Sequence, residues 1–249
     1  MNRFATALLL SIGVTAAGSA AAGDWYFGLS AGQARADVSN EQMIAVGGAA
    51  MWPGGINSVS SESSSLDASD FSWSVFGGFR FTKNFALEVS YVDLGRTSYQ
   101  RQITGIWIHG VTIPPPASFP LVSGTGEVTL DSAGLAVKAL VAAPLGERFD
   151  VHANLGVFAY KTDMHASGSV TTGGISRFDR SADDDSQALS IGVGFGYRFY
   201  GPWTVNLDWQ RYMDVGIDNK ALEEAALSYP EKDFEADRDA VTLSLLLSF

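Results

Sequence analysis

Apolar side chains alternate with small or polar ones along much of this chain. From Trp25 to Ala31 every odd position is apolar, whereas the even positions hold Tyr, Gly or Ser. A period of two is typical of a β-strand with one apolar face. The same pattern recurs in eight segments and predicts strands at 25–31, 71–81, 85–91, 135–141, 151–157, 189–199, 203–209 and 241–249.

The second face of these predicted strands carries mostly small side chains, and we call it the narrow face. It consists mostly of Gly, Ser, Ala, Thr and Asn, with a few charged residues. Such residues are too small for a water-facing surface, but they suit the interior of an eight-stranded barrel whose large apolar side chains face lipid. Closure of the barrel also pairs every backbone amide inside the hydrocarbon. The pattern therefore predicts an all-β fold, an eight-stranded antiparallel transmembrane β-barrel.

Short and long connections alternate between the predicted strands. The short ones contain the Gly, Pro and Asn residues that tight turns favour, and they lie at 82–84, 144–148 and 200–202. The long ones lie near 34–70, 95–127, 162–186 and 213–238. We expect short periplasmic turns and four long extracellular loops, as transmembrane barrels have. Three pairings keep the odd positions on one face: Phe81 with Phe85, Ala143 with Phe149, and Phe199 with Trp203.

The first residues have the composition of an export signal. Arg3 is followed by the apolar stretch Phe4–Val14 and by small residues up to Ala22. This order predicts a signal peptide over 1–22, cleaved after Ala22, and a barrel domain over 23–249. The alternative is a membrane anchor, but the apolar stretch is too short to cross about 30 Å as a helix.

Composition excludes several classes of function. The chain has 27 acidic and 16 basic residues and a net charge of −11, which argues against a nucleic-acid partner. It contains no cysteine and only three histidines, so it offers neither a thiolate zinc site nor a histidine-rich metal site. We therefore expect no metal and no cofactor.

Two segments and the last residue resemble those of a known family. The run from Phe76 to Gly95 is similar to the second hairpin of small Gram-negative outer-membrane β-barrel proteins, namely the opacity-type proteins and the transmembrane domain of outer membrane protein A. Gly192–Phe199 resembles the Gly-x-Gly-x-Gly strand of that family. The resemblance implies the cell outer membrane as location, with outer-membrane lipid and lipopolysaccharide as surroundings. It also implies that the barrel assembly machinery reads Phe249 as an assembly signal.

Charges on the narrow face predict a network that plugs the lumen. Eight strands leave an interior just wide enough for side chains, and unpaired buried charges are costly. The predicted network has three basic and two acidic residues, and Asp150, nearer the periplasmic mouth, balances its surplus positive charge. The alternative is that water solvates each charge separately. The members of the predicted network are Arg80, Glu88, Lys138, Arg198 and Asp208.

The expected hairpin registers assign partners within this network. They place Arg80 opposite Ala86 and diagonal to Glu88, within reach of its long side chain. The other expected placements are Lys138 opposite Asn154, and Arg198 opposite Thr204, two pairs from Asp208.

Acidic residues and apolar patches both concentrate in the long connections. These segments hold 19 of the 27 acidic residues, with clusters at 183–185 and 231–237. The acids either solvate the surface or bridge to lipopolysaccharide through divalent cations, although the chain has no calcium-loop spacing. Apolar patches lie at 43–46 with 51–53 and at 103–116. They either pack together as strand extensions or form a hydrophobic vestibule or host-contact surface.

The sequence shows no catalytic constellation. A serine hydrolase needs serine, histidine and carboxylate at one level of the barrel, and no G-x-S-x-G element accompanies His109, His152 or His165. We therefore expect a non-enzymatic barrel with a structural or surface-interaction role: envelope integrity, adhesion, or recognition of a host or surface ligand through its loops. The alternative is a narrow channel for small hydrophobic molecules. A lipid-modifying barrel enzyme is the less favoured alternative.

Overall fold

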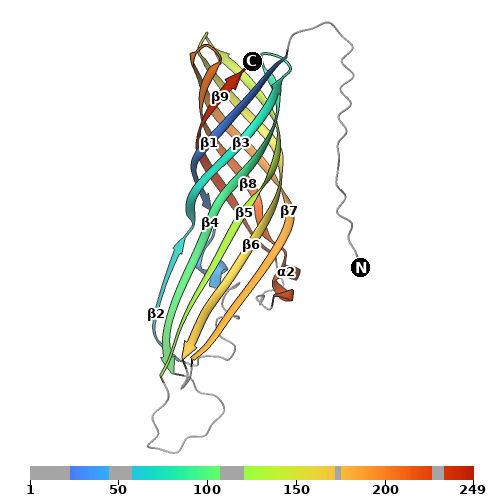
Figure 1. The fold of residues 1–249 in the computed structure, drawn as a ribbon. Helices are drawn as coiled ribbons and strands as arrows, with labels where there is room; N and C mark the ends of the chain where they lie inside the picture. Colours follow the sequence, from blue (N-terminus) through green and yellow to red (C-terminus); the bar gives the residue numbers. More distant parts are fainter. Residues whose placement is uncertain (1–22, 45–57, 107–120, 172–174, 226–232) are drawn as a thin grey trace, which may run out of the picture.

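The computed structural model describes residues 23–44, 58–106, 121–171, 175–225 and 233–249 as an antiparallel β-barrel (Figure 1). A short helix, α2 (Asn219–Glu224), lies between the last two strands. The strands are β1 (Asp24–Ala36), β2 (Ser58–Asp67), β3 (Ser69–Arg80), β4 (Phe85–Ile106), β5 (Leu121–Leu145), β6 (Phe149–Thr171), β7 (Ile175–Tyr200), β8 (Trp203–Ile217) and β9 (Phe234–Ser248).

Some of the predicted features fall outside these ranges. The predicted signal peptide over 1–22 lies outside the described residues, as do the parts of the apolar patches within 45–57 and 107–120. Within the described ranges, no helix is long and apolar enough to cross a membrane.

The strands form one closed ring with eight positions. We call each position a stave, which is one strand or two consecutive strands that share the same place in the ring. Their hydrogen-bonded order is β2-β4-β3-β1-β9-β8-β7-β6-β5, and the additional pairing of β4 with β5 closes the ring. β2 and β3 pair with β4 one after the other, separated only by Ala68, so together they make one stave. The predicted eight-stranded antiparallel barrel is therefore confirmed. Closure pairs each stave on both sides, as the surrounding hydrocarbon requires.

Large apolar side chains cover the outer surface of the ring, as the alternation predicts. Leu29, Val137 and Leu243 are exposed, whereas Tyr26 and Ser90 on the narrow face are buried. A continuous apolar outer surface of this kind would be unfavourable in water but matches the hydrocarbon of a bilayer. The predicted assignment of the two faces is therefore confirmed.

The short turns lie where the sequence predicts them. The Phe81 N–H donates a hydrogen bond of 2.9 Å to the Phe85 carbonyl, which confirms the first predicted pairing. At the third turn, Tyr200 rather than Phe199 is opposite Trp203, and an irregularity in the ladder beside this pair restores the predicted parity. The third pairing was therefore wrong by one residue at the turn and right further along the strands.

The second turn closes later than predicted. Leu145, rather than Ala143, is opposite Phe149 on β6. Gly146 has a positive φ of 85°, which glycine adopts without steric cost, so the chain reverses within 146–148. The resulting shift is an even number of residues, so each side chain stays on its predicted face but meets a different partner.

The strands are much longer than the alternation predicts. Most of 95–127 and 162–186, expected as loops, belongs to β4, β5, β6 and β7. Likewise 34–70 contains β2, and 213–238 contains the end of β8, α2 and the start of β9. The prolonged strands extend beyond the ring on the side away from the short turns, which is the lower end of the view in Figure 1. We call this direction upward, because it points out of the membrane in the predicted topology. We call the extended part the wall, and it comprises 58–67, 96–106, 121–132, 160–171 and 175–188.

The apolar face changes sides along β5. In the ring, the outward residues Leu135 and Val137 are apolar and exposed. In the wall, the inward residues Val128 and Leu130 are apolar and buried, whereas Thr129 between them faces outward. This reversal is expected of a strand that passes from lipid into water, because the surrounding solvent decides which face can be apolar.

Three layers of apolar side chains fill the interior. The uppermost lies between the wall and α2, and it contains Met43 from the first predicted apolar patch. Ile103, from the second patch, is buried on the same inner face of β4. These two residues therefore pack inside the protein. The layers are centred on Tyr26 and Phe76 at the bottom, on Phe158 and Tyr212 in the middle, and on Tyr99 and Leu222 at the top.

Candidate functional site

Glu88 and Lys138 form an ion pair in the lumen. They lie opposite each other on β4 and β5, with Lys138 Nζ 3.6 Å from Glu88 Oε1. The Tyr26 hydroxyl donates a hydrogen bond of 3.2 Å to Glu88 Oε2. On its other side Lys138 is opposite Gly156 rather than the predicted Asn154, because the second turn closes later than expected. Charges this deeply buried are tolerated when they are paired and hydrogen-bonded, as here.

Arg80 has a different partner from the predicted one. It lies opposite Ala86 as expected, but its guanidinium stands over the Tyr26 ring, 5.6 Å from the centroid. Lys138 contacts Glu88 instead, because a residue directly across a strand pair is closer than one on the diagonal. The predicted pairing of Arg80 with Glu88 is therefore replaced by a cation–π contact and a separate ion pair.

A second polar cluster is centred on His152 of β6. Its Nε2 lies 2.7 Å from Asp208 Oδ1, and its Nδ1 lies 3.2 Å from Asp150 Oδ1. Ser244 donates a hydrogen bond of 2.9 Å to the other oxygen of Asp208. A serine nucleophile would need to reach the histidine, whereas this serine reaches the carboxylate. The sequence signal for an inward-facing His152 was its even position on β6, which it shares with Asn154 on the narrow face.

The lumen charges line two small cavities rather than a pore. Glu88, Lys138 and Asp208 line one cavity of about 60 Å³. Arg80 and Arg198 line another of about 50 Å³, nearer the short turns. Each space has room for only a few water molecules.

An aromatic layer closes the lumen above these cavities. Phe158 and Tyr212 pack with ring centroids 4.9 Å apart, and Tyr160 stacks on Phe158 at 5.4 Å. Phe158 is fully buried, and Tyr212 has an exposed fraction of 3%. Across the described residues, the interior is thus filled by alternating polar and apolar layers.

Ion pairs mark the level where the apolar outer surface ends. Arg96 Nε lies 3.0 Å from Asp131 Oδ1, and Lys161 Nζ lies 3.2 Å from Asp183 Oδ2. Arg211 makes a similar pair with Asp239. In Arg96, Lys161 and Arg211, hydrogen bonding to the aspartate partners and their negative charge raise the pKa of the basic group. We call this set the charged collar, and it comprises Arg96, Asp131, Lys161, Asp183, Arg211 and Asp239.

The acidic cluster at 183–185 does not act as one unit. Asp183 contacts Lys161 on the outer face, whereas Asp184 accepts a hydrogen bond of 3.1 Å from the backbone N–H of Asp218. Successive residues of a strand point to opposite faces, which separates these carboxylates. In the part of the chain that the structure describes, no group of three His, Asp or Glu side chains is arranged to hold a metal ion.

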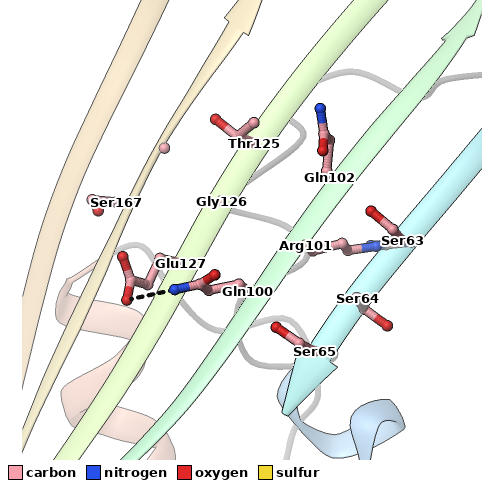
Figure 2. Close-up of a pocket in the computed structure, with 11 residues that line it drawn as sticks. Ser63, Ser64, Ser65, Gln100, Arg101, Gln102, Thr125, Gly126, Glu127 and Ser167 are labelled. Atoms are coloured by element: carbon pink, nitrogen blue, oxygen red, sulfur yellow. Dashed lines mark hydrogen bonds between the residues drawn. The ribbon is translucent and has the colours of Figure 1, made fainter. Parts of the chain in front are cut away.

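The outer face of the wall carries a polar groove of about 490 Å³ (Figure 2). Gln100 Nε2 donates a hydrogen bond of 3.3 Å to Glu127 Oε1 across β4 and β5. The groove was missed from the sequence because its residues fall in segments expected to be loops. We define the polar groove by Ser63, Ser65, Gln100, Gln102, Thr125 and Glu127.

Phe249 lies at the end of the ring beside β1. Its N–H donates a hydrogen bond of 3.0 Å to the Trp25 carbonyl, and its ring stacks on Phe27 with centroids 5.8 Å apart. The side chain itself is exposed. Its role as an assembly signal stays a prediction.

The closed ring, its apolar outer surface and its filled interior define a transmembrane β-barrel of the outer membrane. The chain belongs to the OmpA-like transmembrane domain family, whose sequence match covers residues 20–249. The resemblance to the transmembrane domain of outer membrane protein A and the location in the cell outer membrane are therefore confirmed.

Several solved structures of outer-membrane barrels are similar to this chain. Neisserial surface protein A is 11% identical, with 90% of this chain and 97% of that chain covered and a TM-score of 0.43. Ail, the attachment invasion locus protein of Yersinia pestis, is 10% identical, with 91% and 99% covered and a TM-score of 0.36. OprG from Pseudomonas aeruginosa is 10% identical, with 90% and 96% covered and a TM-score of 0.43. A search of curated protein sequences gave no significant match.

Proposed function

We propose that this protein is a closed barrel that acts at the cell surface, through contacts made by its wall and loops, rather than by transport or catalysis. The observation that carries this proposal is the filled lumen. A channel would need a continuous path between the two ends of the ring, whereas the described interior holds two small cavities beneath a packed aromatic layer.

The surface role has two parts. In the structural part, the apolar band sits in the hydrocarbon and the charged collar lies beside the headgroups of outer-membrane lipid and lipopolysaccharide. In the interaction part, the wall presents a wide sheet above the membrane, where adhesion or recognition of a surface ligand takes place. The barrel assembly machinery remains the expected partner during insertion.

Single-channel recording in planar bilayers tests this proposal against the runner-up, a narrow channel for small hydrophobic molecules. We expect no steady conductance from the unmodified protein, with or without added hydrophobic solutes. A channel-forming porin recorded in the same bilayers is the positive control, because it shows that the assay detects an open barrel. Stable conductance of the unmodified protein, or conductance that changes with hydrophobic solutes, would establish the channel instead.

A further inference from the structure

Around the polar groove, the outer face of the wall carries mainly hydroxyl and amide side chains. The register of β2, β4, β5 and β6 aligns them in two rows that cross all four strands. Four strands spaced about 4.8 Å apart give each row a length of about 14 Å, and the rows are about 7 Å apart. One row is Ser65, Gln100, Glu127 and Ser167; the other is Ser63, Gln102, Thr125 and Ser169.

The stability of the wall does not explain this composition. Residues on the inner face hold the strands together, where Tyr99, Val128 and Met164 are buried. On the outer face, the side-chain pairs Thr125 with Ser169 and Gln100 with Glu127 cross the strands, and pairs of this kind contribute only about 0.2–1 kcal/mol each. Ser63 and Ser65 are the clearest case, since both are exposed on this face. The outer face is therefore better explained by what it contacts.

The polar groove is almost free of charge, although the chain is strongly acidic. Glu127 is the one carboxylate among its defining residues, and Gln100 holds it by a hydrogen bond. Arg101, between Gln100 and Gln102 on β4, also lines the groove, but its Nε lies 2.9 Å from Glu62 Oε1. The groove therefore offers donors and acceptors but no free cation among the described residues that line it. A polyanion would find no counter-charge there.

We infer that the polar groove binds a neutral saccharide chain, which deepens the surface role proposed above and rests on it. Sugar hydroxyls both donate and accept hydrogen bonds, and so do the Ser and Thr hydroxyls and the Gln amides of the two rows. The two rows run side by side, and a chain of several sugar rings can lie along them. Along β4 and β5, the groove (Figure 2) lies beyond the collar residues Arg96 and Asp131, on the side away from the ring. Saccharides of neighbouring lipopolysaccharide molecules extend at this height.

Binding experiments on the full barrel in lipid nanodiscs test this inference. One arm uses a neutral O-polysaccharide released from lipopolysaccharide, and the second uses an array of other neutral glycans. The Gln100→Ala, Gln102→Ala double variant should weaken binding about tenfold or more, because each amide supplies hydrogen bonds to the sugar. The matched control is Ser181→Ala, on the outer face of β7 outside the groove, which should bind as the unmodified protein does. Thermal unfolding of each variant checks that the barrel is intact.

The arms separate the two sources of the same ligand chemistry. Stronger binding in the first arm identifies saccharides of the cell's own envelope, and stronger binding in the second identifies foreign glycans; either supports the inference. Absence of neutral saccharide binding in both arms, binding confined to sulfated glycans, or equal binding by the double variant would overturn it. The recording experiment is independent of these outcomes, so a closed barrel that binds no saccharide refutes the saccharide site alone.

Discussion

Glu88 and Lys138 lie where the barrel is narrow and water is scarce. Both side chains are largely buried, and Tyr26 completes the hydrogen bonding of the carboxylate. An exposed ion pair contributes less than about 1 kcal/mol, because water screens the charges and the side chains lose entropy. Removal of one partner from a buried pair is more costly, about 3–5 kcal/mol, because it leaves the other charge uncompensated. A single substitution in the lumen pair should therefore strongly affect the stability of the ring.

Glu88→Ala should lower the free energy of unfolding by about 3–5 kcal/mol, because it leaves the Lys138 ammonium buried without its carboxylate. Combination with Lys138→Ala should cost less than the sum of the two single changes. Urea-induced unfolding from lipid vesicles measures all three variants.

The same cycle with Arg80→Ala is the control. Arg80 and Glu88 both contact Tyr26, so their changes should couple, but more weakly than those of Glu88 and Lys138, which contact each other directly. A stronger coupling of Glu88 to Arg80 than to Lys138 would contradict the observed pairing.

β5 shows which parts of the fold could be predicted from the sequence. Its lower half was found because apolar residues at 135–141 occupy the lipid face. Its upper half, 121–132, also alternates, but its apolar residues occupy the inner face, since the strand has passed into water. A search for one apolar phase therefore ends at the membrane boundary. On β4 the phase is shifted further by an irregularity at 93–96, where Gly95 has a φ of 71°.

Residue parity also explains how far the candidate site could be predicted. Parity alone places Glu88 and Lys138 on the inner face, because successive side chains of a strand alternate. Their pairing depends on the register of β4 against β5, which are joined by a long connection that does not set an offset as a tight turn does. The polar groove requires the same register, so neither the ion pair nor the groove could be read from the chain.

Three substitutions on β5 test the reversal of its faces. Val137→Arg, outward in the ring, should cost about 2–4 kcal/mol in lipid vesicles. Thr129→Arg, outward in the wall, should change stability by less than about 0.5 kcal/mol. Val128→Arg, inward in the wall, should be strongly destabilising, because it buries a charge in the uppermost apolar layer. Equal costs for Val137→Arg and Thr129→Arg would show that the wall does not stand in water.

At the scale of the whole molecule, the ring and the wall have different surroundings. The ring meets hydrocarbon outside and is packed inside, so it holds the protein in the outer membrane. The wall extends beyond the ring on one side (Figure 1) and packs its inner face against α2. Its outer face lies beyond the charged collar. In the proposed role, contacts with other molecules are made by the wall and loops, and the height of the lipid boundary decides which outer side chains are available for them.

An accessibility scan with spin labels along β5 measures that boundary directly. The chain contains no cysteine, so single cysteines at the outward positions 141, 137, 133, 129 and 125 can be labelled without interference. In lipid bilayers, oxygen should relax the labels at 141 and 137 most, and a water-soluble nickel complex those at 129 and 125, with the crossover at the level of Asp131. Oxygen-dominated relaxation that continues through 125 would place the polar groove in lipid and contradict a wall that stands above the membrane.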